Sequence, residues 1–162
     1  MSQPAALPSV VQNLCLWLVV ALLGGGCMTS PDKTLFSTNG SGWTVRQGQA
    51  IWRPGFKYPE LAGEIVLAEN TDGRRSLQFT KTLLPVTLAQ TTPTNWLIQF
   101  PPQRLGFSGG GQPPRRFTWL YLPAALAGET LPDNFKFTPL PAAGWRLEND
   151  RTGEFVEGFI SP

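Results

Sequence analysis

The side chains available for acid–base chemistry in this 162-residue chain are scattered carboxylates, because the sequence contains no histidine. That absence removes imidazole proton transfer, histidine metal ligands and every Ser–His or Cys–His nucleophile. The acidic residues occur singly; Glu154 and Glu157, three apart in a predicted strand, would point to opposite faces of a sheet. A hydrolase would need carboxylates from different strands to converge in a cleft, and no spacing nominates them. We therefore expect no enzyme activity, no catalytic residue, no metal site and no cofactor.

The glycine and charge patterns exclude two further kinds of site. Gly109, Gly110 and Gly111 lack the preceding strand, the following helix and the lysine of a phosphate-binding loop, so they predict a turn. The 13 basic and 11 acidic residues give a net charge of +2, and the basic ones are dispersed apart from Arg74–Arg75 and Arg115–Arg116. A nucleic-acid-binding protein would show a concentrated basic patch, so nucleic acid is not an expected partner.

The thiol of Cys27 is the one reactive group with a clear sequence context. It follows the ten apolar residues 14–23 and three glycines, and the first 31 residues contain no Lys, Arg, Asp or Glu. Ten residues are about half of the roughly 20 that a helix needs to cross a bilayer, so this run predicts the core of a signal peptide. The sequence LLGGGC resembles the bacterial lipobox, which implies cleavage before Cys27 and acylation of this residue.

Two other interpretations of this segment stay open: an ordinary cleaved signal peptide in which Cys27 is incidental, and an uncleaved tail. The cysteine count favours acylation, because loss of Cys15 with the signal peptide leaves Cys27 as a sole thiol that can form no internal disulfide. Acyl chains would anchor the protein, since each buried CH2 contributes about 0.8 kcal/mol. Asp32 stands five positions after Cys27, so no acidic sorting cue adjoins the lipidated residue. We expect an envelope lipoprotein of the outer membrane that faces the periplasm.

The chain is predicted to have three parts. Residues 1–26 form the signal peptide, residues 27–42 a lipidated flexible tether rich in Ser, Thr, Gly and Asn, and residues 43–162 a single β domain. The 136 residues left after cleavage suffice for one domain that buries roughly two thirds of its unfolded surface, and not for two.

A period of two along most of residues 43–162 predicts strands. The clearest hairpin is 61–81, with a turn at 70–73, and further hairpins are predicted at 86–100 and 145–160. The segment 101–114 is rich in proline and glycine and predicts a connection with at most a short strand at 105–108.

Residues 115–122 break the strand rhythm. Pro113 and Pro114 precede them, and Phe117, Leu120 and Tyr121 recur at a helical spacing, which predicts a short helix ended or kinked by Pro123. The competing interpretation is a strand, because the sequence FTWLYL is aromatic and has high β propensity. With the helix, the fold is mainly β: a curved antiparallel sheet, or open half barrel, with one short helix covering it.

Large apolar side chains are abundant in the predicted domain, and most of them would fill its core. A curved sheet with one covering helix can also leave an apolar cavity on its concave face. The candidate cavity residues are the inward side chains of the central strands and of the helix: Ile65, Leu67, Phe79, Leu88, Trp96, Ile98 and Trp119. Which face is inward is not fixed by the sequence, since a register shift of one residue exchanges the whole set.

The order of these elements resembles the LolA/LolB superfamily of lipoprotein carriers. The similarity covers about residues 43–160 and rests on the hairpin 61–81, the loop TLLP at 82–85, the strands 86–90 and 96–100, and the helix 115–122 followed by Pro123. It implies a half barrel that holds acyl chains without catalytic groups. It also implies a membrane-facing loop with exposed leucines, here Leu83 and Leu84; the alternative is that both leucines tuck back into the core.

The sequence therefore predicts an anchored lipoprotein that binds acyl chains of lipids or lipoproteins and serves lipoprotein localisation to the outer membrane. Its partners would be the membrane, held through Cys27, the acyl chains and a periplasmic carrier protein. The alternative is a structural or scaffolding envelope lipoprotein with a filled core that binds another protein. A cavity of several hundred Å3 between sheet and helix favours the first function, and a filled interior favours the second.

Overall fold

Alternating apolar and polar side chains build an almost entirely β structure in residues 34–161, the part of the chain that this computed structural model describes. The elements are β1 (Trp43–Arg53), β2 (Leu61–Asn70), β3 (Arg75–Lys81), β4 (Leu84–Thr91), β5 (Asn95–Phe100), the 3-10 helix η1 (Pro101–Gln103), β6 (Leu105–Gly110), α2 (Thr118–Leu126), β7 (Phe135–Leu140), β8 (Gly144–Asn149) and β9 (Glu154–Ile160). The predicted signal peptide, Cys27 and the tether up to residue 33 lie outside the described residues.

The strands form one antiparallel sheet in the order β6-β5-β4-β3-β2-β1-β9-β8-β7. Sequence neighbours pair from β1 to β6 and from β7 to β9, and β9 joins these two sets by pairing with β1 along Gly48–Arg53. The predicted hairpins are thus present as β2/β3, β4/β5 and β8/β9. Strands β6 and β7 are the two edges, so the sheet is curved but not closed.

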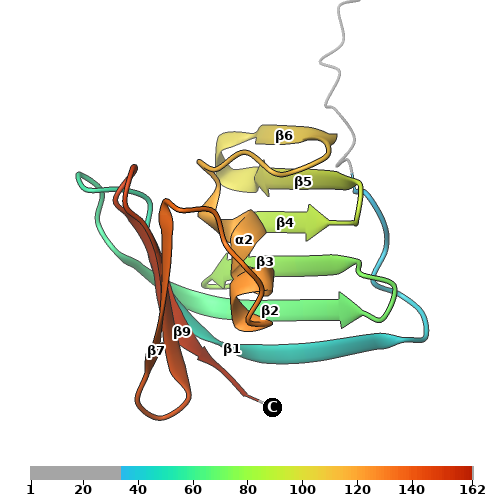
Figure 1. The fold of residues 1–162 in the computed structure, drawn as a ribbon, viewed down its shortest axis with the longest axis horizontal. Helices are drawn as coiled ribbons and strands as arrows, with labels where there is room; N and C mark the ends of the chain where they lie inside the picture. The colour runs from blue at the N-terminus through green and yellow to red at the C-terminus, as the bar shows by residue number, and fades with distance from the viewer. Residues whose placement is uncertain (1–33, 162) are drawn as a thin grey trace, which may run out of the picture. The chain divides into compact units, whose positions relative to one another are not determined.

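The sheet bends where β1 is shared between two sets of strands. In Figure 1, β7 and β9 run across the direction of β2 to β5, and β1 passes from one set to the other. Two glycines allow this close crossing. A Cβ on Gly48 would lie 2.8 Å from the Cα of Ile160, and a Cβ on Gly158 would lie 2.9 Å from the Cα of Ala50. Side chains at these positions would push β1 and β9 apart.

Helix α2 lies on one face of this bent sheet and supplies much of the core. Seven of its nine residues are buried, and Trp119 and Leu122 have no exposed surface. The Trp119 ring stacks on Phe79 of β3, with centroids 5.1 Å apart, and meets Trp52 of β1 edge-on at 5.6 Å. The prediction of a mainly β fold with a curved antiparallel sheet and one helix is confirmed.

Three elements differ from the predictions. Strand β6 extends to Gly110 and so includes Gly109 and Gly110, for which a turn was predicted. The helix begins at Thr118 and continues through Pro123 to Leu126, while residues 115–117 precede it. Continuation is feasible because a proline costs the helix one backbone hydrogen bond, and burial of Trp119 and Leu122 outweighs that loss. Strand β7 was not predicted at all. It contains Pro139, which argues against a central strand but is tolerated at the edge of a sheet, where β7 lies.

Candidate functional site

Six of the seven candidate cavity residues come together between the sheet and α2. The shared property of this group is almost complete burial: Ile65, Leu67, Phe79, Ile98 and Trp119 are 0 % exposed, and Trp96 is 9 % exposed. They belong to one continuous core cluster, in which they contact each other and the other side chains of α2. The space that the sequence assigned to a ligand is therefore occupied by Trp119 and its neighbours in this structure.

Leu88 is the exception, because it lies on the other face of the sheet. The pairing of β3 with β4 shifts register between Phe79 and Thr80, where Val86 of β4 is left without a partner. Before this shift, Phe79 faces Thr87 and Gln78 faces Leu88. Directly opposed residues share a face, which places Thr87 inward with Phe79 and Leu88 outward with the exposed Gln78. The predicted face of Leu88 was wrong because a bulge reverses alternation and leaves no mark in the hydrophobic pattern.

A buried carboxylate holds the N-terminal end of α2. The carboxylate of Glu154 accepts hydrogen bonds from the Trp52 indole N–H at 2.8 Å and from the Thr118 hydroxyl at 2.6 Å. Burial raises the pKa of Glu154, and the bonds from Thr118 and Trp52 oppose that rise. The sequence predicted that Glu154 and Glu157 point to opposite faces of the sheet, but it did not predict the contacts of Glu154 with α2. Glu154 is 7 % exposed because the first residue of β9 points toward the helix.

The flanks of α2 are also tied to the sheet. The side-chain amides of Asn134 and Asn149 both donate to the carbonyl of Arg115, at 3.3 and 2.9 Å. Beyond the helix, the Glu129 carboxylate accepts a hydrogen bond from the Arg75 guanidinium of β3. This bond lowers the pKa of Glu129. The helix is thus held by polar contacts at both ends as well as by its apolar face.

Some polar atoms inside the core have no hydrogen-bond partner among the described residues. They include the indole nitrogens of Trp119 and Trp145 and the hydroxyl oxygen of Thr87. Buried polar atoms are paired in most proteins, so each of these is a point at which a bound molecule or a rearrangement of α2 could supply a partner.

The turn between β3 and β4 exposes the two leucines that the resemblance nominated. Leu83 is 90 % exposed and Leu84 is 68 % exposed, so the alternative in which both tuck into the core is wrong. Thr82 and Leu83 have φ angles of 49° and 68°. This region suits glycine or asparagine in a tight hairpin, and a leucine there is both strained and displayed to solvent.

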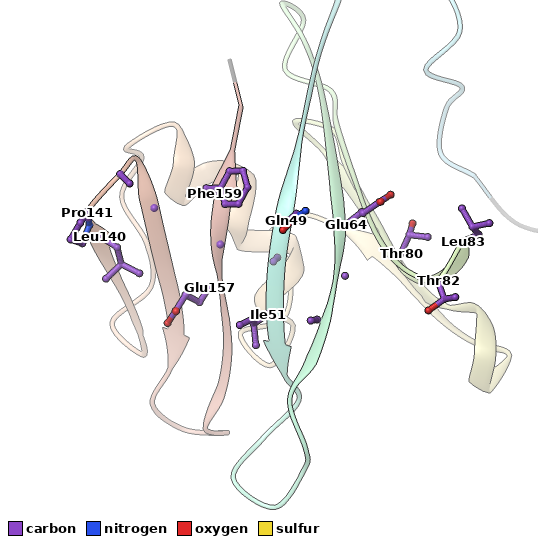
Figure 2. A pocket seen from close by; sticks show the side chains of 16 residues that line it. Gln49, Ile51, Glu64, Thr80, Thr82, Leu83, Leu140, Pro141, Glu157 and Phe159 are labelled. Atoms are coloured by element: carbon purple, nitrogen blue, oxygen red, sulfur yellow. The ribbon is translucent and has the colours of Figure 1, made fainter.

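An open groove of about 710 Å3 begins at this turn and crosses the face of the sheet opposite α2. Figure 2 shows it from close by, with Leu83 and Thr82 at one end, Leu140 and Pro141 at the other, and Gln49 and Ile51 between them. Its exposed apolar side chains include Ile51, Phe159 and Leu83. None of the seven candidate cavity residues lines it.

The floor of the groove is a row of side chains in register across six strands. Residues that face each other directly across neighbouring strands form the series Thr80, Glu64, Gln49, Phe159, Gly144 and Leu140. At about 4.8 Å between strands, the row extends over roughly 24 Å. These residues lie far apart in the sequence, so no local motif could have pointed to the groove.

The groove carries carboxylates and no basic side chain in its lining. Glu64 and Glu157 line it, and Lys and Arg are absent from the residues that do so. Arg146, which lies beside the groove, donates to Glu157 at 3.0 Å and to Glu148 at 3.3 Å. Within residues 34–161, Glu64 has no ion-pair partner, so the residues that line the groove carry a net negative charge.

A second groove, of about 630 Å3, runs beside the C-terminal end of α2. Arg75 and Glu129 line it and neutralise each other. Among the described residues there is no cluster of three or more side chains suited to hold a metal ion. No helix in that part of the chain is long and apolar enough to cross a membrane.

Comparison of the chain with protein-family models and with curated proteins finds no match.

Proposed function

We propose that this protein is an anchored envelope lipoprotein whose β domain binds a partner protein through its outer surface, at the Leu83–Leu84 turn and the groove that starts there. One observation carries the proposal: the interior is filled by α2, while apolar side chains are displayed on the opposite face. A filled interior is the feature expected of a scaffolding protein. Exposed apolar groups that adjoin a groove are typical of interaction sites.

The strained turn is a further reason to place the contact at Leu83. An Asn-Gly pair would form the same turn without strain, yet the chain has Thr82 and Leu83 there. Strained positions persist where they serve a function, and the function served here is the display of an apolar side chain.

Anchoring through Cys27 in the outer membrane, facing the periplasm, is part of this proposal. It rests on the lipobox-like sequence and the sole remaining thiol of the mature chain. Mass spectrometry of the protein purified from membranes should show cleavage before Cys27 and the added mass of acyl chains. An unmodified Cys27 would exclude the anchor.

Site-specific photo-cross-linking in intact cells tests the partner-binding function. A photoreactive phenylalanine analogue in place of Leu83 should give a discrete adduct with one protein. The same analogue in place of Leu105 is the control, because Leu105 is 53 % exposed on β6 but does not line the groove. Adducts of equal yield at both positions, or none at position 83, would contradict the proposal.

A second function, binding of acyl chains in a LolA/LolB-like half barrel, is favoured by the arrangement of α2. One short helix covers the inner face of the sheet, and the connections before and after it are rich in proline and glycine. Polar atoms without a hydrogen-bond partner among the described residues lie in the core beside it. Displacement of α2 would expose Trp119 and Leu122, which costs about 1.5–3 kcal/mol for each fully buried large side chain. Bound acyl chains would have to cover a similar apolar surface to offset this cost.

Displacement of a fluorescent fatty acid tests this second function. The wild-type protein should take up the probe. If the interior is the site, Phe79→Ala should reduce this uptake. Ile51→Ala serves as the control, because Ile51 lies on the opposite face. If the wild type takes up no probe, or Ile51→Ala alone reduces uptake, interior binding fails.

A further inference from the structure

The chemistry of the outer groove indicates which kind of partner segment it accepts, an inference that rests on the proposed partner-binding function. Its apolar side chains lie at both ends and along the floor: Leu83 at one end, Leu140 at the other, and Ile51 and Phe159 between them. A ligand that covers them must itself be apolar over much of its length. At roughly 24 Å, the floor matches about seven residues of extended chain at about 3.3 Å each, so a hexapeptide covers most of it.

The charges select among apolar ligands. Glu64 is exposed and lacks an ion-pair partner within residues 34–161, and Arg146 shares its charge between Glu148 and Glu157. Within the groove lining, the carboxylates of Glu64 and Glu157 thus occur without a lysine or arginine. The chain as a whole has a net charge of +2, so the groove is opposite in sign to the average surface. An anionic headgroup or an acidic peptide would be repelled here.

We propose that the groove binds a segment of a partner protein in which lysine or arginine alternates with large apolar residues. The apolar side chains would cover Phe159, Ile51 and Leu83, and a cationic side chain would reach the Glu64 carboxylate. Gln49, which is paired with both Glu64 and Phe159 across neighbouring strands, offers an amide to the backbone of that segment. Electrostatic complementarity sets the preference for a basic segment, and the apolar contacts supply the affinity.

Three hexapeptides with blocked ends, added to the acylated mature protein in phosphatidylcholine nanodiscs, test this inference. One alternates leucine with lysine, one leucine with glutamate, and one serine with lysine; empty nanodiscs give the background. The leucine–lysine peptide should bind saturably, about tenfold more tightly than the leucine–glutamate peptide. The serine–lysine peptide should give no saturable binding. Binding of the first peptide should weaken as salt rises, because the charges are exposed.

Matched variants locate the binding. Glu64→Gln should weaken binding of the leucine–lysine peptide about two- to fivefold, the range of a partly exposed charge pair. Glu60→Gln removes the same charge from an exposed residue outside the groove lining and should leave binding unchanged. Phe159→Ser should weaken it further than Glu64→Gln.

Several results would overturn the inference. They are equal binding of the leucine–lysine and leucine–glutamate peptides, equal effects of Glu64→Gln and Glu60→Gln, or a signal no larger than that of empty nanodiscs. A photoreactive residue in place of Phe159 that forms adducts with lipid alone would also overturn it, in favour of a membrane contact. If these peptide tests fail but a photoreactive residue at position 83 still forms a discrete protein adduct, the preference for a basic segment is wrong. The proposed partner-binding function would then remain supported.

Discussion

The environment of Glu154 shows how one side chain can couple a helix to a sheet. Its two oxygens accept hydrogen bonds from Trp52 on β1 and from Thr118 at the first turn of α2. A negative charge at the start of a helix is favourable, whereas removal of a carboxylate from water is costly. The cost of burial is the larger effect, so the pKa of Glu154 is raised. The protonated form is therefore favoured by folding.

This balance predicts a particular pH dependence of stability. The pKa of Glu154 is raised in the folded state above 4.5, its ordinary value, so the folded protein binds the proton more tightly than the unfolded chain. The contribution of Glu154 to the free energy of unfolding is then greatest below about pH 4.5 and is lost as the pH rises through the folded-state pKa. The loss amounts to about 1.4 kcal/mol for each unit that separates the two pKa values.

Urea denaturation of the wild type and of Glu154→Gln between pH 4 and 8 measures this effect. Glutamine does not titrate, so the stability of the variant relative to the wild type should increase with pH over that window. A stability difference that stays constant from pH 4 to 8 would contradict the raised pKa. Glu129→Gln is the comparison of opposite sign, because the hydrogen bond from Arg75 lowers the pKa of Glu129, so the stability of that variant relative to the wild type should not rise with pH.

At the scale of elements, the two hairpin tips at the ends of the groove share an unusual backbone. Thr82 and Leu83 between β3 and β4, and Ala142 and Ala143 between β7 and β8, all have positive φ angles between 49° and 68°. Each tip turns tightly where glycine or asparagine is usual. We infer that the two tips are held in this form by their strands, and that the strain at Leu83 accompanies its exposure.

Replacement of Thr82 and Leu83 by Asn and Gly should change stability and binding in opposite directions. The double substitution should raise the free energy of unfolding by about 1–2 kcal/mol, because it relieves two left-handed residues. It should also weaken peptide binding in the groove, because the apolar side chain of Leu83 is lost. Replacement of Ala142 and Ala143 by Asn and Gly is the matched control for stability, and should stabilise by a similar amount. A destabilised protein at either tip would contradict the assignment of strain.

At the scale of the whole molecule, the bend at β1 shapes both the inner face of the sheet, which packs against α2, and the outer face, which carries the groove. It wraps the sheet around α2 on one side, and it brings β3 and the β7–β8 tip to opposite ends of one groove on the other. The bend depends on the close approach of β1 to β9, which Gly48 and Gly158 permit. Loss of this approach should therefore disturb the core and the groove together.

Gly48→Ala tests the role of the bend. A Cβ there would overlap the carbonyl oxygen of Phe159, which is rigid backbone, so we expect a loss of about 2 kcal/mol or more in unfolding free energy and weaker peptide binding. Gly106→Ala is the control, since its added Cβ would meet the side chain of Gln99 at an ordinary 3.5 Å. If both variants unfold at the same urea concentration, the bend does not depend on Gly48.

Much of the local structure was predictable from the sequence. Alternation identified the hairpins β2/β3, β4/β5 and β8/β9, and the proline pair with the spacing of Phe117, Leu120 and Tyr121 indicated the helix. Strand β7 was missed because Pro139 hides an edge strand. Ile65 and Phe79 lie on one face, as the alternation groups them, whereas Leu88 lies on the other face because the bulge in β4 interrupts the alternation.

The sequence alone determined that this chain builds a mainly β domain around aromatic residues, because alternation and side-chain type act locally along the chain. Only the tertiary structure decided what that domain offers to a ligand. Whether α2 fills the concave face depends on how Trp119 packs against Phe79 and Trp52, three residues from different elements. The groove likewise depends on strand pairing that brings Glu64 beside Gln49 and Gln49 beside Phe159. Such contacts are set by the summed packing of the whole sheet, which no local pattern contains.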